Sequence, residues 1–154
     1  MNSFYRAYDR IKDELLTIDN LNTVIEDRGN DADLFKKNIY PMGVIYVEGA
    51  NMFPYGIVNT TAYDNFTFRV MVVSPRDFSN SEDSRFYRND NYVDNLNICY
   101  DILKKLSEKL LKLDNGVKMT AVTEPLPGYL DYNNGLDGWQ INITLEVVKN
   151  YICK

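Results

Sequence analysis

Two short segments of the chain gather carboxylates, from which metal or hydrolytic chemistry would have to be built. One group comprises Glu26, Asp27, Asp31 and Asp33, and the other comprises Asp77, Glu82 and Asp83. Clustered carboxylate oxygens suit Mg²⁺ or Ca²⁺, and a pair of carboxyl groups suits glycoside hydrolysis. The first group departs from EF-hand spacing, however, and Arg28, Arg76 and Arg85 offset the acidic charge. Solvated loops explain both groups better, so the sequence predicts no metal, no cofactor and no catalytic residue.

Other catalytic classes lack their residues. The chain has no histidine, which excludes Ser-His and Cys-His nucleophile systems and histidine-based zinc sites. Its two cysteines, Cys99 and Cys153, cannot form a four-thiolate site, and no glycine-rich phosphate-binding motif is present. The sequence therefore predicts a protein that is not an enzyme.

Charge and hydropathy exclude further classes. The net charge of −5 and pI of about 4.7 disfavour binding to a phosphate backbone. No apolar run is long enough to span a membrane, and the opening residues, MNSFYRAYDR, lack the apolar core of a signal peptide. We expect a protein that is not exported, with both cysteines reduced. The length of 154 residues suits a single domain, residues 1–154.

Two segments have helical periodicity. Residues Ser3–Asp19 carry an apolar seam, and Asp90–Asn115 is predicted as a long helix that ends at Gly116. Apolar residues of the long helix recur at steps of three and four and predict its buried stripe. They are Val93, Leu96, Tyr100, Leu103, Leu106, Leu110 and Leu113.

The remaining apolar segments are predicted to be strands. They are Leu21–Asp27, Met42–Glu48, Asn65–Ser74, Val117–Glu124 and Gly138–Val148, with a short edge piece at Ile57–Thr61. Met42–Glu48 is apolar at nearly every position, which predicts a central strand that ends at Gly49. Asn65–Ser74 and Gly138–Val148 alternate, so each has two distinct faces. Phe66, Phe68, Val70 and Val72 share one face of the first strand, and one face of the second carries Trp139, Ile141, Ile143, Leu145 and Val147. The order predicts an α+β fold: an antiparallel or mixed sheet with an N-terminal helix and a long central helix packed on one face.

Four segments in this order carry a resemblance to a known family. They are DADLFKKNIYPMGVIYVEGAN (Asp31–Asn51), TAYDNFTFRVMVVSPRDF (Thr61–Phe78), DNLNICYDILKKLSEKL (Asp94–Leu110) and GWQINITLEV (Gly138–Val147). A basic–Asn–Ile–Tyr–Pro segment enters a central apolar strand. A Phe-x-Phe-x-Val strand, a polar loop, a long helix and a Trp-led strand follow. The pattern resembles the small tail-terminator or tail-completion proteins of tailed bacteriophages.

The resemblance implies a virion structural protein that forms a ring, usually a hexamer, at the head-proximal end of the tail or in the neck. Such a ring is assembled in the host cytoplasm, caps the tail tube and joins it to the neck or connector proteins. DNA passes through the lumen without specific binding, which suits an acidic protein. A closed ring needs complementary opposite edges. An apolar strand edge or Tyr-rich loops on one side and a helix face on the other would satisfy this requirement.

Three turn-like segments are candidate interfaces: Gly49–Gly56, Pro75–Asp90 and Glu124–Gly135. Their aromatic residues are Tyr55, Phe78, Phe86, Tyr87, Tyr129 and Tyr132. These side chains either contact partners or fold back over the sheet. Two other functions stay open: a related ring or adaptor of the neck or short tail that binds partners through its sheet edge and loops, and a carboxylate-dependent hydrolase.

Overall fold

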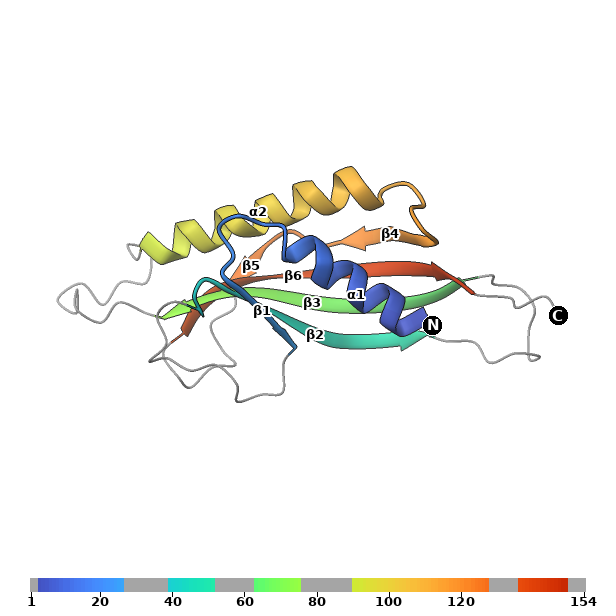
Figure 1. Ribbon diagram of the computed structural model, residues 1–154. Coiled ribbons are helices and arrows are strands. Elements are labelled where there is room, and N and C mark those ends of the chain that lie inside the picture. The colour runs from blue at the N-terminus through green and yellow to red at the C-terminus, as the bar shows by residue number, and fades with distance from the viewer. Residues whose placement is uncertain (1–2, 27–38, 52–62, 76–89, 128–135, 150–154) are drawn as a thin grey trace.

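The computed structural model describes residues 3–26, 39–51, 63–75, 90–127 and 136–149. These residues form two helices and six strands in the order shown in Figure 1. The helices are α1 (Ser3–Leu15) and α2 (Asp90–Leu110). The strands are β1 (Thr23–Glu26), β2 (Met42–Asn51), β3 (Tyr63–Pro75), β4 (Val117–Val122), β5 (Leu126–Pro127) and β6 (Leu136–Val148).

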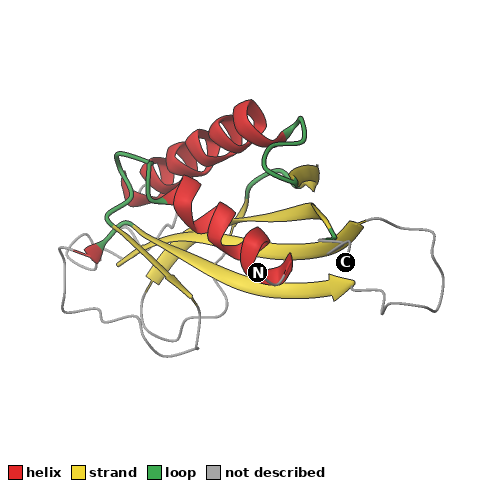
Figure 2. Ribbon diagram, turned by 45° about the vertical axis from the view of Figure 1, so that its right-hand side comes forward, coloured by secondary structure: helices red, strands yellow, loops and turns green. Residues whose placement is uncertain are grey.

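All six strands belong to one mixed sheet. Its order is β1-β2-β3-β6-β4, and the short strand β5 also pairs with β6. β1 is parallel to β2, and every other pair is antiparallel. β3 and β6 pair along their entire lengths in the middle of the sheet. Both helices cover the same face of the sheet, which confirms the predicted α+β fold (Figures 1 and 2).

The alternation of β3 and β6 determines which side chains meet the helices. Phe66, Phe68, Val70 and Val72 of β3 are fully buried in one cluster with residues of both helices. The same cluster takes Ile141, Ile143, Leu145 and Val147 from β6. Successive side chains of a strand point to opposite faces, so these residues form a continuous apolar floor under the helices. The face assignment made from the sequence is confirmed.

Aromatic contacts hold α1 against this apolar face of the sheet. The ring of Phe4 meets that of Phe66 edge to face, with centroids 5.6 Å apart and an interplanar angle of 73°. Tyr8 lies 6.4 Å from Phe68, measured between ring centroids. Aromatic pairs in such orientations add about 0.5–1.5 kcal/mol beyond the area they bury. The N-terminal half of α1 is thereby held over β3.

A second, smaller cluster lies on the sheet face opposite the helices. Its buried members are Tyr40, Met42, Val44, Met71 and Val73. Strands β2 and β3 are therefore buried on both faces at this end, which explains why their sequences are apolar at nearly every position. β2 lies between β1 and β3 from Met42 to Ile45, which confirms the prediction of a central strand for this part of β2.

The predicted buried stripe of the long helix is wrong in most of its members. Only Leu106 and Leu110 are buried; Val93, Tyr100 and Leu113 are each 54% exposed. Leu96 and Leu103 are half-buried. The face that meets the sheet consists instead of Asn95, Ile98, Cys99, Ile102, Leu106 and Leu110. The sequence contains two overlapping apolar stripes, and the structure buries the one that begins at a polar residue.

The predicted end of the same helix is also wrong. α2 ends at Leu110, and Gly116 lies beyond it in a tight turn. Asp114 and Val117 exchange both backbone hydrogen bonds around Asn115 and Gly116, whose φ angles are 50° and 77°. Two consecutive left-handed residues are typical of a type I′ turn, for which Asn-Gly is the favoured dipeptide. The turn starts β4.

β2 continues through the predicted break at Gly49. Its register with β3 shifts between Val47 and Gly49, so Glu48 forms a bulge and pairing resumes as far as Asn51. A bulge absorbs one extra residue without ending the strand. An added Cβ at Gly49 would meet nothing within 4 Å, so the glycine leaves open space beside the strand.

Candidate interfaces at the two edges of the domain

None of the aromatic residues predicted for the interface falls within the described residues. Tyr55, Phe78, Phe86, Tyr87, Tyr129 and Tyr132 all lie in the ranges 52–62, 76–89 and 128–135. Most of the carboxylate groups also lie outside, except Glu26, which is exposed at the end of β1. Within the described ranges, no group of three or more Cys, Asp or Glu residues is placed to hold a metal ion. The same part of the chain contains no helix long and apolar enough to cross a membrane.

The sheet has a first edge at which β2 is only half covered. β1 pairs with β2 from Met42 to Ile45. From Val47 to Asn51, β2 pairs with β3 on one side and with no described strand on the other. Val47 lies in this half, opposite Phe68, and its side chain is 46% exposed. An apolar side chain is thus exposed beside a stretch of backbone that pairs with no second strand among the described residues, an arrangement that allows another strand to pair.

One flank of α1 extends this edge into the helix layer. Tyr5 of α1 and Leu16, which directly follows the helix and still donates its N–H to the Lys12 carbonyl, are 57% and 58% exposed. At 3.6 residues per turn they lie about 140° and 120° around the helix from Arg10, which points toward the turn between α2 and β4. They are therefore on the side of α1 away from α2. We define the first edge as β1, the Val47–Asn51 half of β2, and this flank of α1.

Tyr8 of α1 packs against the main core beside Phe68 of β3. Burial raises the pKa of its phenol, and the charges of Glu26 and Asp9 raise it further.

The second edge is formed by β4. Among the described strands, β4 pairs only with β6. The side chain of Val122 in this strand is 40% exposed. Val122 lies opposite Ile143, a residue of the main core, and therefore on the face that carries the helices. Lys118 is the only charged residue of β4. The first edge, by contrast, carries Glu26 and Glu48 on its strands.

One flank of α2 continues the second edge. Lys105 Nζ donates a 3.2 Å hydrogen bond to the Thr17 carbonyl, so Lys105 faces the segment that follows α1. Tyr100 and Val93 lie about 140° and 120° around the helix from Lys105. They are on the side of α2 away from α1, with the half-buried Leu103 nearby on the same side. We define the second edge as β4 and this flank of α2.

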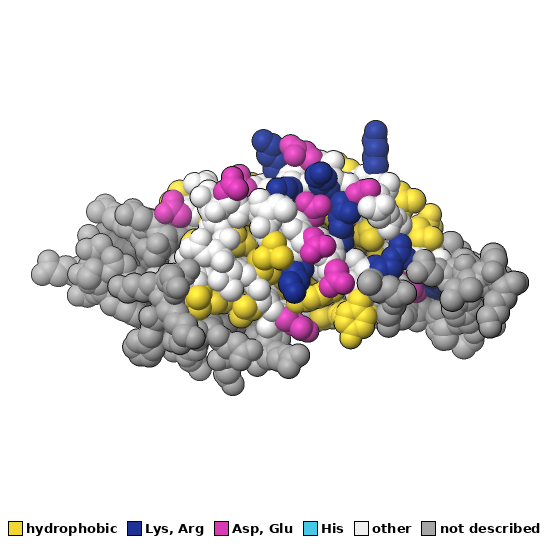
Figure 3. Space-filling model, in the orientation of Figure 1, with side chains coloured by type: hydrophobic (Ala, Val, Ile, Leu, Met, Phe, Trp, Pro, Cys, Tyr) yellow, Lys and Arg dark blue, Asp and Glu magenta, His cyan; other side chains and the backbone are white. Residues whose placement is uncertain are grey.

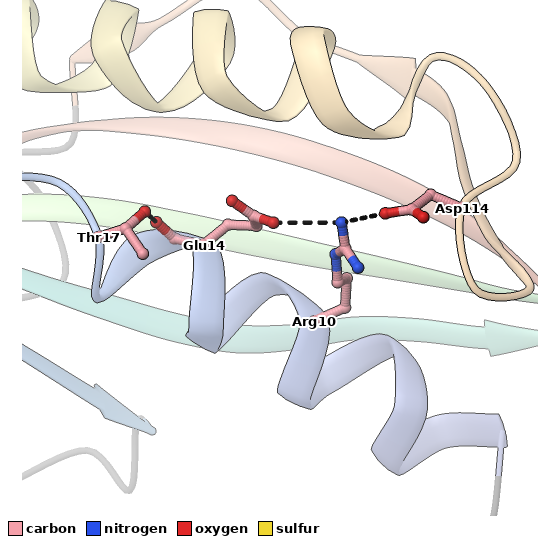
Figure 4. Close-up of polar contacts among 4 residues, drawn as sticks. All are labelled: Arg10, Glu14, Thr17 and Asp114. Carbon is pink, nitrogen blue, oxygen red and sulfur yellow. Dashed lines mark hydrogen bonds and ion pairs between the residues drawn. The ribbon is translucent and has the colours of Figure 1, made fainter.

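Ion pairs fasten α1 to the turn between α2 and β4. Arg10 Nη2 lies 2.5 Å from Asp114 Oδ2 and 3.2 Å from Glu14 Oε1 (Figure 4). Thr17 Oγ1 donates to the Glu14 carbonyl at 2.6 Å in the turn that follows α1 (Figure 4). Arg10 thereby joins residues that are far apart in the sequence. These contacts lie on the side of α1 that faces α2, so the outer flanks of the two helices take no part in them.

The start of α1 is fixed to the sheet by a second group of polar contacts. Ser3 Oγ donates to Asp64 Oδ2 at 2.7 Å, and Lys149 Nζ lies 3.7 Å from Asp64 Oδ1. Arg6 donates from Nη1 to the Val148 carbonyl and from Nη2 to the Asn115 carbonyl, each at 2.9 Å. A carboxylate beside a helix N-terminus is favoured by the helix dipole.

The start of α2 is fixed by a buried pair. Ser74 Oγ donates a 3.0 Å hydrogen bond to Asn95 Oδ1, and Asn95 is fully buried. This bond links the end of β3 to the first turns of α2. Both helices are thus anchored at several points, and the two edges are held at fixed positions on opposite sides of the domain.

The helix layer itself has the surface of a solvated protein. Lys, Arg, Asp and Glu side chains are interspersed over the helices, with hydrophobic side chains exposed between and beside them (Figure 3). A mixed surface of this kind does not create a large field of one sign. Exposed apolar residues that flank a strand edge are therefore the features that favour a partner.

A comparison of the chain with protein-family models finds no match, and none is found among curated protein sequences.

The edge residues Tyr5, Val47, Tyr100 and Val122 were missed by sequence reasoning. The spacing of Tyr100 fits the predicted buried stripe, and Val122 has the pattern of an ordinary strand residue. A strand's position within a sheet is a non-local property, so no pattern inside Val117–Val122 marks it as an edge. The symmetry of a closed ring by itself requires two complementary edges.

Proposed function

We propose that this protein is a virion structural protein that forms a closed ring, a hexamer, at the head-proximal end of a phage tail or in the neck. It caps the tail tube and joins it to the connector. The observation that carries the proposal is the pair of edges on opposite sides of one domain. Each edge combines an incompletely paired strand with exposed apolar side chains on the neighbouring helix.

Opposite edges are what a ring requires. In a ring every subunit uses two different surfaces, one for each neighbour, and the rotation between neighbours must close. An isologous dimer would need only one self-complementary surface. The sheet runs between the two edges through β3 and β6, whose 13-residue pairing gives a stiff spacer. This arrangement favours a heterologous assembly over a dimer.

The charge of the chain fits a DNA passage. A net charge of −5 per subunit gives a ring a weakly repulsive lumen, so DNA passes without being held by its phosphates. The ring's partners are the tail tube protein on one side and the neck or connector proteins on the other. The proposal includes no catalytic residue, cofactor or metal.

The test of this function is binding to tail-tube ends. Purified protein is mixed with tail tubes that lack a terminator and examined by negative-stain electron microscopy. The proposal predicts a disc of extra density at one end of each tube and an arrest of tube growth. Tubes that elongate at the same rate and show bare ends would contradict it.

An adaptor of the neck or short tail is the second candidate, and one observation favours it. The free half of β2 is suited to accept a single extended peptide, which would add a strand to the sheet. An adaptor of this kind binds one partner segment per chain and needs no second edge. A stoichiometric complex with a monomeric chain would therefore favour the adaptor over the ring.

A further inference from the structure

The two edges have strand directions that match. From β2 to β3, β6 and β4, each neighbouring pair is antiparallel. Three reversals leave β4 antiparallel to β2. If a second copy is added edge to edge by a rotation that preserves strand direction, its β4 runs antiparallel to β2 of the first copy. Antiparallel pairing is the more stable arrangement per residue and needs no change in either strand.

The two edge strands also match in face and in irregularity. Val47 pairs with Phe68 and Val122 pairs with Ile143, so both valines lie on the helix-covered face. β2 has its bulge between Val47 and Gly49, and β4 has one between Met119 and Ala121. If Val47 is placed opposite Val122 and Glu48 stays outside the ladder, as it does in the pairing with β3, Gly49 comes opposite Ala121 and both pairs have matching faces.

We propose that the sheet continues across the subunit boundary, with β4 of one copy paired antiparallel to the Val47–Asn51 half of β2 in the next. In this register Val47 lies opposite Val122, and Gly49 lies opposite Ala121. The pairing covers two exposed valines, 46% and 40% exposed, that otherwise face water. This inference rests on the proposed ring, since it names the surface that joins its subunits.

The charges on the two edge strands are already balanced within one chain. Lys118 lies opposite Glu146 of β6, and Glu48 forms an ion pair with Arg69 of β3, on the face away from the helices. The pairing of β4 with β2 therefore brings no uncompensated charge of either strand into the contact. A lysine on an edge strand also discourages indiscriminate pairing with other chains.

The same arrangement also brings helices of the two neighbouring copies into contact. When β4 of one copy lies beside β2 of the next, the flank of α2 with Val93 and Tyr100 comes next to the flank of α1 with Tyr5 and Leu16. These four side chains are between 54% and 58% exposed in the single chain. Tyrosines with an apolar body and a polar tip are favoured at such contacts. Both layers of the domain thus contribute to one interface.

The experiment is disulfide trapping in full-length protein that carries Cys153→Ser. The first variant combines Val47→Cys with Val122→Cys, and the second combines Gly49→Cys with Ala121→Cys. Opposed residues of an antiparallel pair have Cβ atoms about 4.5–5.5 Å apart, close to disulfide geometry. The mismatched control combines Val47→Cys with Ala121→Cys, which lie on opposite faces. Cys99 is fully buried and stays in all variants.

The expected result is a ladder of covalent oligomers under mild oxidation for both matched pairs, reversed by reductant. Single-cysteine variants and the mismatched control should stay at the mass of one chain. Dimers from a single-cysteine variant would overturn the inference, since they indicate an isologous contact. If light scattering gives a mass above one chain but neither matched pair forms a ladder, this interface is wrong and the proposed ring stands. A single-chain mass without any ladder overturns both.

Discussion

Val47 and Val122 lie on the same face of the sheet at its two opposite edges, and both side chains are exposed. Each lies next to a core residue of the adjacent inner strand, Phe68 for Val47 and Ile143 for Val122. The apolar floor under the helices therefore reaches both edges without being covered there. Contact of these edges with a neighbouring subunit would bury apolar side chains that are exposed in the single chain.

A charge at either valine should break the assembly. We expect Val122→Lys and Val47→Lys each to reduce the oligomer to single chains, because a buried lysine without a partner costs several kcal/mol at an interface. The free energy of unfolding of the single chain should change by no more than about 0.5 kcal/mol, since both positions are exposed. Light scattering gives the mass, and urea denaturation gives the stability.

Leu113→Lys is the matched control for these variants. Leu113 is 54% exposed in the turn between α2 and β4, outside both edges as defined by their residues. It receives the same charge as the edge variants, so a general effect of net charge on association would appear there as well. Equal loss of mass in all three variants would argue against an interface at the edges.

The buried bond between Ser74 and Asn95 should contribute to stability more than an exposed bond of the same chemistry. Ser74→Ala removes the donor to the buried Asn95 amide, and we expect a loss of about 1–3 kcal/mol in the free energy of unfolding. Thr17→Ala removes an exposed hydroxyl bond to the Glu14 carbonyl and should cost less than about 0.5 kcal/mol. Equal losses in urea denaturation would show that the start of α2 is not anchored by this pair.

The thiol of Cys99 should make the protein less stable at high pH. Burial raises the pKa of Cys99 from 9.0 to about 12. Below the lower value the thiol is protonated in both states, so it has no effect on stability. Between the two values the unfolded chain releases the proton and the folded chain retains it. The free energy of unfolding therefore falls as pH rises through this range.

Urea denaturation at several pH values measures this dependence, with Cys99→Val as the control. The variant retains every other titrating group but has no thiol, so its stability should fall less steeply above about pH 9. In the folded protein Cys99 should also resist thiol reagents, because the protonated thiol is unreactive. Parallel curves for the two proteins would contradict a buried, high-pKa thiol.

The sequence predicted those parts of the fold that depend on local periodicity. The two faces of β3 and β6 follow from a period of two, and the residues that the alternation groups together lie together on the helix-covered face. Met42–Glu48 was recognised as central because it is apolar on both faces. These patterns are local, and burial in the sheet confirms them.

Other features depend on partners that are distant in the sequence. The buried face of α2 begins at Asn95, whose burial is stabilised by a hydrogen bond from Ser74 of β3, a partner 21 residues away in the sequence. The bulge at Glu48 allows β2 to pass Gly49 because β3 continues alongside it. β1 pairs parallel to β2, and nothing within its four residues specifies that neighbour. The edges could not be located until the strand order was known.

The most direct test of the proposed ring is the mass of the purified protein in solution. Static light scattering at several concentrations and moderate salt reports whether opposite edges join copies of the chain. We expect a stable mass that corresponds to a hexamer of the 17.9 kDa chain, which Val122→Lys reduces to one chain. A mass of one chain at every concentration, unchanged by that substitution, would contradict it.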